Sequence, residues 1–292
     1  MRTMGSLRHV RVGCEFEYDS QIETPAVFQV QPYDARPATL LSQSWGSTPQ
    51  LERHGYTDVY GNDCQRLNLP AGLSTVRYDA IFSVPDATEE VDLDAVENPV
   101  TALPDDTLQY TLPSRYVLPD VLGDEAWKLF GGEPPGYRRV QAICDYVNGH
   151  LSFAYGSSTP LTTAADVHAA GRGVCRDFAH LAITFCRALN IPARYVFGYL
   201  PDMDVTPMPE PMDFAAWMEV YLGDRWWTFD PRNNQARKGR VRIGRGRDAL
   251  DVAMVTTYGA PVLNRMLVWS DEVSHDVGTQ ASGGGRDVTA SP

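Results

Sequence analysis

The N-terminal region of the chain alternates between apolar and polar residues in the manner of β-strands. The segments HVRVGCEFEYD (9–19) and VRYDAIFSV (76–84) both place an apolar side chain at every second position. A period of two is typical of a strand that buries one face. Between these segments, Gly61–Asn62 suits a hairpin turn because both residues accept a positive φ. The sequence therefore predicts a compact antiparallel β domain over residues 1–110.

A helical spacing follows a connector that is rich in proline and glycine, residues 111–136. In YRRVQAICDYVNGHL, apolar residues recur every three or four positions, as on the buried face of a helix. A short helix is expected in TTAADVHAAG, with a threonine as its cap. A third helix is expected to begin at Cys175 and to end before Asn190 and Pro192. Its predicted buried face consists of Phe178, Leu181, Ala182, Phe185 and Leu189.

Three apolar segments then have the character of strands: ARYVFGYL, AAWMEVYL and WWTFDP. The last two are joined by Gly223–Asp224, a good pair for a tight turn. With the preceding helices they predict a second domain over residues 137–277, in which helices pack on an antiparallel sheet. The tail, residues 278–292, is small, polar and glycine-rich, so we expect it to be disordered. The predicted fold class is α+β, with the β domain first and this core second.

Composition limits the classes of function. The chain has 292 residues, of which 43% are hydrophobic, and its formal net charge is -12. An acidic field argues against binding to nucleic acid or to an anionic membrane. No segment approaches the ~20 apolar residues of a membrane span, and the N-terminus lacks the apolar core of a signal peptide. We therefore expect a soluble cytoplasmic protein with no nucleic-acid or membrane partner.

The cysteines are odd in number, 5, and they form no CxxC pair. This pattern supports neither a disulfide framework nor a zinc site, so we expect reduced thiols and no metal or organic cofactor. Most of these cysteines are interpreted as small buried hydrophobic residues. That set consists of Cys14, Cys64, Cys144 and Cys186.

Cys175 differs because it follows Gly171 and Gly173 at the predicted start of a helix. Free backbone N–H groups and the positive end of the helix dipole stabilise a thiolate at such a position. The same N–H groups can hold an oxyanion that forms beside the sulfur. The position therefore indicates a catalytic nucleophile.

The two strands that follow test this interpretation. A two-residue turn at Gly223–Asp224 places Trp217 opposite Asp230, and position 215 is then the diagonal neighbour of Asp230 on the same face, roughly 7–8 Å away. A histidine at position 215 would place its ring between Asp230 and a nearby thiolate, which is the arrangement of nucleophile, base and orienting group. The chain has alanine at this position.

The segments GRGVCRDFAHL, RALNIPARYVFGYL and AWMEVYLGDRWWTFDP, in this order, resemble the bacterial transglutaminase-like superfamily of papain-like cysteine enzymes. The resemblance is strong over about residues 140–235, and the N-terminal β region is similar to the accessory domain of the bacterial members. It implies a papain-like core with Cys175 as the nucleophile and Asp230 as the third member of the triad. The histidine of the family, in a His-Ala-Trp sequence, maps onto Ala215.

Alanine can neither accept the thiol proton nor donate one to a leaving amine. Among the other histidines, His180 lies about 140° around the helix from Cys175 and points elsewhere. His168, from the preceding helix, and His54, from the β domain, are weaker candidates. We expect Asp230 to hold a tyrosine or an arginine instead, since a buried carboxylate without a partner is costly.

Two further features have alternative interpretations. The cluster of Trp217, Trp226, Trp227 and Phe229 is typical of a core, although Trp217 and Trp226 border the predicted cleft and are candidates for substrate binding. The basic run RKGRVRIGRGR either forms a patch for an acidic ligand or balances local carboxylates, and the second is the simpler interpretation.

Three functions are consistent with the sequence. The first is amide or thioester chemistry through Cys175, as a hydrolase or an acyl transferase acting on a peptide, a protein or a small molecule. The second is a catalytically silent member that binds a peptide or protein partner in the inherited cleft. The third is an enzyme disabled by a histidine-to-alanine substitution at position 215.

Overall fold

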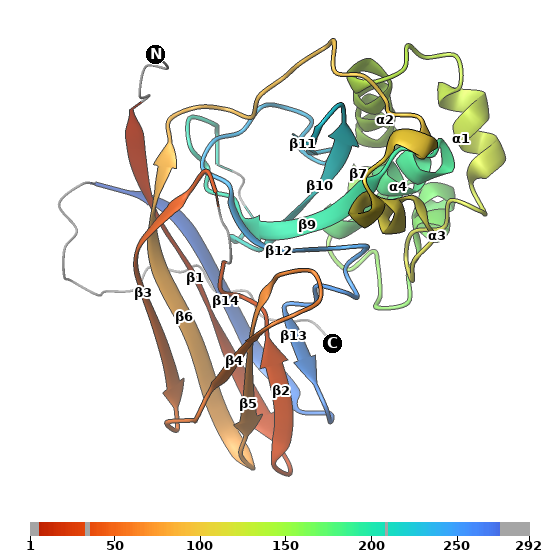
Figure 1. Ribbon diagram of the computed structural model, residues 1–292. Coiled ribbons are helices and arrows are strands. Elements are labelled where there is room, and N and C mark those ends of the chain that lie inside the picture. The colour runs from red at the N-terminus through yellow and green to blue at the C-terminus, as the bar shows by residue number, and fades with distance from the viewer. Residues whose placement is uncertain (1–5, 33–35, 208–209, 275–292) are drawn as a thin grey trace.

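The computed structural model describes residues 6–32, 36–207 and 210–274, so the predicted disordered tail at 278–292 lies outside the described residues. The chain forms an α+β fold in which a pair of β-sheets lies beside a helical region built on a further sheet (Figure 1). The predicted fold class is confirmed. No helix in the described ranges is long and apolar enough to cross a membrane.

Long strands from both ends of the chain build the pair of sheets. The first sheet has the order β14 (Val262–Val273), β1 (Leu7–Ser20), β6 (Gly72–Pro85) and β3 (Thr39–Thr48). The second has the order β13 (Val255–Thr257), β2 (Thr24–Phe28), β5 (Asp63–Leu69) and β4 (His54–Thr57). All strand pairs in these sheets are antiparallel.

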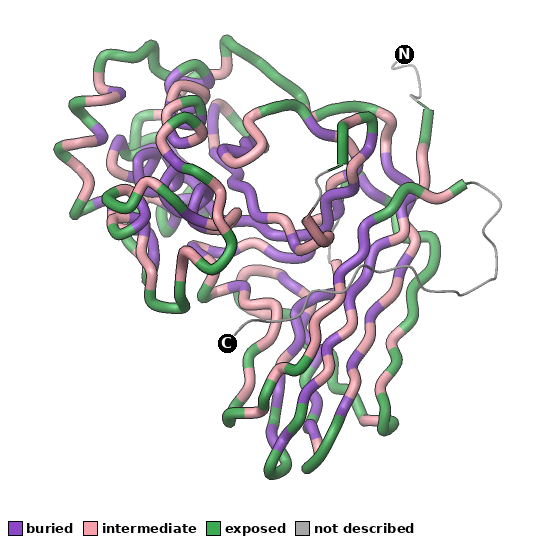
Figure 2. Tube along the Cα trace, turned by 180° about the vertical axis from the view of Figure 1, so that it is seen from behind, coloured by how far each residue is buried: buried purple, intermediate pink, exposed green. Residues whose placement is uncertain are grey.

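The alternation predicted for β1 is confirmed, because its apolar positions are buried. They face the second sheet, where the rings of Phe16 and Phe28 lie 5.6 Å apart, edge to face. Figure 2 shows buried and exposed positions taking turns along these long strands. The hydrophobic contact between the two sheets therefore follows from the period of two in the sequence.

The last strands of the chain return to this pair of sheets. β14 pairs with β1 along most of its length, and β13 pairs with β2. In Figure 1 the two C-terminal strands accordingly lie beside β1 and β2. Segments that fall within residues 137–277, the range predicted for the core, thus complete the sheets of the N-terminal region.

The core contains a third sheet and the helices. Its sheet has the order β11 (Arg225–Phe229), β10 (Ala215–Leu222), β9 (Ala193–Tyr199) and β12 (Val241–Gly246). A short parallel pair joins β7 (Ser152–Phe153) to β8 (Arg172–Gly173). The helical elements are η1 (Val100–Ala102), η2 (Asp105–Thr111), α1 (Gly123–Phe130), α2 (Tyr137–His150), α3 (Ala164–Ala170) and α4 (Cys175–Ala188).

Local sequence signals fix the elements that surround Cys175. The Thr163 hydroxyl caps α3 by accepting a hydrogen bond from the Asp166 backbone N–H. α4 begins at Cys175, as predicted, and the left-handed backbone of Asn190, with φ of 62°, follows its end. Leu222 pairs with Arg225 across the predicted Gly223–Asp224 turn. These elements place α4 against β9 and β10. The predicted buried residues are all buried, and they are Phe178, Leu181, Ala182, Phe185 and Leu189.

Candidate active site

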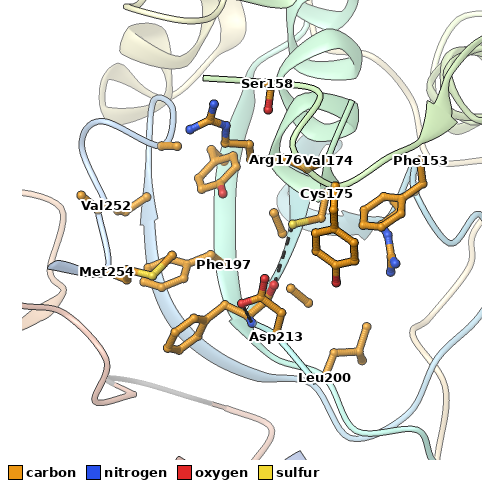
Figure 3. A pocket seen from close by; sticks show the side chains of 18 of the residues that line it. Phe153, Ser158, Val174, Cys175, Arg176, Phe197, Leu200, Asp213, Val252 and Met254 are labelled. Carbon is orange, nitrogen blue, oxygen red and sulfur yellow. Dashed lines mark hydrogen bonds between the residues drawn. The ribbon is translucent and has the colours of Figure 1, made fainter. Parts of the chain in front are cut away.

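Cys175 is the first residue of α4, and a short segment that contains β8 connects it to the end of α3. Gly171 ends α3 with φ of 64°, a left-handed conformation that favours glycine. Gly173 follows in β8, and a Cβ at this position would lie 2.7 Å from the Asp177 Cβ. The sequence therefore needs glycine here to bring the start of α4 close to β8. The half-buried Cys175 side chain faces a cavity of about 600 Å³ (Figure 3).

The pKa of the Cys175 thiol lies above its ordinary value. Burial raises its pKa to about 12, and the charges of Asp213 and Asp177 act in the same direction. The Asp177 carboxylate also accepts a hydrogen bond of 2.8 Å from the Val174 backbone N–H, so a negative charge already occupies the positive end of α4. The sulfur lies 3.8 Å from the Phe214 carbonyl oxygen, to which the thiol donates. The helix terminus therefore does not supply the thiolate that we expected from the sequence.

Ala215 begins β10 and lines the same cavity as Cys175. Its backbone pairs with Gly198 of β9, which fixes this end of the strand. The structure thus brings together the cysteine and the position at which the family resemblance placed a histidine. Within the described residues, the lining of this cavity contains no histidine.

Asp230 follows β11 and is not among the residues that line the Cys175 cavity. It lines a separate, smaller cavity of about 160 Å³ together with Arg240. Its carboxylate accepts hydrogen bonds of 2.7 Å from the Asn233 side chain and 2.7 Å from the Arg240 guanidinium. Burial opposes ionisation, but the Arg240 charge and the Asn233 hydrogen bonds lower the Asp230 pKa below its ordinary value. The partner of this carboxylate is an arginine, as we expected for a chain without the imidazole.

The predicted substrate-binding tryptophans do not line the Cys175 cavity. Trp217 is buried, and the Arg240 guanidinium lies 4.9 Å from the centre of its ring. Trp226 packs edge-on against Tyr110, and Arg194 covers it at 3.9 Å. The aromatic residues in the lining come from other segments: Tyr116, Phe153, Tyr155, Tyr195, Phe197 and Phe214. A role for Trp217 or Trp226 in binding a ligand therefore lies outside this cavity.

The alternative histidines all lie away from the Cys175 cavity. His180 is buried between the rings of Tyr116 and Tyr195, and its Nε2 accepts a hydrogen bond from the Ala249 backbone N–H. His168 contacts the Tyr146 hydroxyl at 3.1 Å, and His54 is exposed on β4. None of these three histidines lines the Cys175 cavity.

The basic run at residues 237–247 pairs with acidic side chains of the same molecule. This agrees with the simpler interpretation, in which the run balances local carboxylates. The ion pairs are Arg237–Asp202, Lys238–Asp86, Lys238–Asp204, Arg240–Asp230, Arg240–Glu89, Arg242–Glu219 and Arg247–Asp251.

Sequence reasoning missed the acidic residues of the cavity. Asp213 and Glu210 precede β10 and both line the cavity. Figure 3 shows the Asp213 carboxyl group directed toward Cys175. Burial raises the pKa of Asp213, against the lowering effects of the Phe214 N–H and the Arg232 charge. In the sequence, Asp213 and Glu210 are marked only by their position just before the strand AAWMEVYL. A loop has no regular period, so its sequence does not show which side chains point into a cavity.

Comparison with known proteins agrees with this architecture. The sequence model of the transglutaminase-like superfamily matches residues 126–231, which include α2, α3, α4 and Asp230. A crystal structure from Cytophaga hutchinsonii, described as that of a "putative cysteine protease", aligns over 96% of this chain and 95% of its own, with 29% identity and a TM-score of 0.83. Residues 126–231 therefore form a domain of the transglutaminase-like superfamily.

Two uncharacterised mycobacterial proteins are also similar in sequence. The Mycobacterium leprae protein is 34% identical over 119 residues, which is 40% of this chain and 42% of that protein. A Mycobacterium tuberculosis protein is 38% identical over 143 residues, which is 46% of this chain and 45% of that protein. The chain spans less than half the length of these relatives.

Proposed function

We propose that this protein binds a peptide in the Cys175 cavity and does not turn it over by cysteine catalysis. The observation that carries the proposal is the pairing of Cys175 with Ala215 in one cavity, whose described lining contains no histidine. The alanine side chain has no atom that can accept a proton, so Ala215 cannot act as the general base for the thiol.

The state of the thiol supports the same conclusion. A pKa of about 12 leaves a thiolate fraction on the order of 10⁻⁵ at pH 7. The thiolate is the nucleophilic form, so the intrinsic rate falls with that fraction. Removal of a triad member typically lowers kcat by roughly 10⁴-fold or more. Asp230 does not compensate, since its carboxylate is bound by Arg240 and Asn233.

The cavity itself supports a binding role. Its volume of about 600 Å³ lies within the range of ligand sites, roughly 300–1,000 Å³. Aromatic and aliphatic side chains form most of the lining, and a few charged groups are placed among them. The description of the Cytophaga hutchinsonii protein as a cysteine protease supports a peptide as the class of ligand.

Amide or thioester chemistry through Cys175 is the second candidate. It is favoured by the position of the sulfur, which faces the cavity from the first turn of α4. This candidate requires a base other than histidine, and the Asp213 carboxylate in the same cavity would have to take that role.

A comparison of turnover with binding separates the two candidates. Wild type and Cys175→Ala are incubated with a panel of fluorogenic peptide amides and peptide thioesters, and binding of the same labelled peptides is measured by fluorescence anisotropy. We expect equal background turnover for the two proteins and retained binding by both. Turnover by wild type that disappears in Cys175→Ala would show that the protein is an enzyme.

A further inference from the structure

Two acidic side chains in the cavity, Asp213 and Glu210, form no ion pair with another described residue. Asp213 accepts a hydrogen bond of 2.7 Å from the Phe214 backbone N–H, and no ion pair joins it to another described residue. Glu210 has a buried oxygen, Oε2, with no hydrogen-bond partner among the described residues. A buried carboxylate is stable only when a charge or a set of donors compensates it. The protein therefore leaves negative charge in this cavity without full compensation.

The arginines of the same cavity are engaged with other groups. Arg237 forms an ion pair of 2.8 Å with Asp202. Arg176 donates hydrogen bonds to the Thr159 carbonyl and to Asp177. Arg232 lies over the Phe153 ring, 4.2 Å from its centre, and its charge lowers the pKa of Asp213 although the two side chains form no ion pair. The cavity thus has both signs of charge, but none of these described arginines forms an ion pair with Asp213 or Glu210.

The walls of the cavity also suit a cation. Six aromatic residues contribute to its lining, and the face of an aromatic ring attracts an ammonium or guanidinium group. A neutral or anionic ligand would remove water from Asp213 and Glu210 without replacing it by a positive charge, which is unfavourable. A cationic group would instead satisfy the carboxylates and contact the rings.

We propose that the ligand of this cavity is a peptide with a cationic side chain, and that Asp213 and Glu210 recognise its ammonium or guanidinium group. This inference rests on the peptide-binding function proposed above. The Asp213 carboxyl is directed toward Cys175 in Figure 3, so the cation lies close to the sulfur and to Ala215. The small side chain of Ala215 leaves room for the ligand at this place.

Four peptides test the proposal on the wild-type protein. They are N-acetylated tripeptide amides with lysine, ε-N-acetyl-lysine, arginine or citrulline between two alanines, and binding is measured by isothermal titration calorimetry. We expect the lysine or the arginine peptide to bind at least about tenfold more tightly than its neutral counterpart, the size expected for hydrogen bonds to a charged group. The preferred cation identifies which of the two groups the cavity recognises.

Variants assign the preference to residues. We expect Asp213→Asn to remove most of the preference for the cationic peptide, and Glu210→Gln to reduce it. Asp120→Asn is the matched control, because Asp120 is exposed and does not line the cavity, and it should leave the preference unchanged. Circular dichroism and thermal unfolding establish that each variant is folded, and the comparison of peptides on wild type does not depend on any variant.

Equal affinity for charged and neutral peptides would overturn the inference while leaving peptide binding intact. So would a cationic preference that survives both Asp213→Asn and Glu210→Gln. If none of the peptides binds, this inference and the proposed function both fail.

Discussion

The reactivity of Cys175 provides a sharp test of the state of the site. Burial raises the thiol pKa from 9.0 to about 12, so the thiolate fraction near pH 7 is about 10³ lower than in an unperturbed cysteine. Iodoacetamide reacts with the thiolate, and its rate follows that fraction. We therefore expect Cys175 in the folded protein to be alkylated about 10³-fold more slowly than in the same chain unfolded in urea.

The assay follows alkylation of the peptide that contains Cys175 by mass spectrometry at several times and pH values. The rate should rise about tenfold per pH unit up to at least pH 10, because the pKa lies above this range. Labelling at pH 7 within about tenfold of the unfolded chain would refute the reasoning, since it would require an ionised sulfur.

Ala215→His extends this test. An imidazole at position 215 can form an ion pair with the sulfur and thereby lower the thiol pKa. We expect at least about tenfold faster alkylation of Cys175 in this variant at pH 7. Ala87→His is the matched control, because Ala87 is exposed and does not line the cavity. An unchanged rate in Ala215→His would show that position 215 does not present its side chain to the sulfur.

Three further predictions concern stability and pH. Arg240→Ala leaves Asp230 buried without its cationic partner and should lower the free energy of unfolding in urea by about 3–5 kcal/mol; a loss below 1 kcal/mol would contradict the pairing. Gly173→Ala should cost about 1–3 kcal/mol in the same assay, because the added Cβ would lie 2.7 Å from the Asp177 Cβ, and an unchanged stability would contradict this close approach. The affinity for a cationic peptide should be full above the pKa of Asp213 and should fall as pH decreases through it, because only the ionised carboxylate attracts the cation. Since burial raises that pKa, calorimetry should place the midpoint above the ordinary ~3.9 of aspartate, and affinity that is independent of pH would contradict the role of Asp213.

Local periodicity predicted those parts of the fold in which one face of an element is buried. The alternation in β1, the start of α4 at Cys175 and the turn at Gly223–Asp224 were all correct. Each depends on residues that are near in sequence, because strand period, helix capping and turn conformation are local properties. The family resemblance, by contrast, paired Cys175 with position 215, and both residues line one cavity.

Other parts depend on contacts between distant segments. The return of β14 to β1 and the pairing of Arg240 with Asp230 follow from the folded chain, and no short motif encodes them. Trp217 was a candidate for substrate binding because of its place on β10, yet Arg240 covers it. Asp213 was missed because a loop gives no periodic signal for the direction of a side chain. Sequence patterns therefore predicted elements better than they predicted the lining of the cavity.

The central claim is that the cavity binds a peptide without cysteine catalysis, and product analysis after binding tests it most directly. The lysine tripeptide amide is held at a concentration that calorimetry shows to be saturating, first with wild type and then with Cys175→Ala, and the peptide is analysed by mass spectrometry. We predict similar dissociation constants for the two proteins and an intact peptide in both samples. Cleavage or deamidation of the peptide by wild type, absent in Cys175→Ala, would contradict the claim.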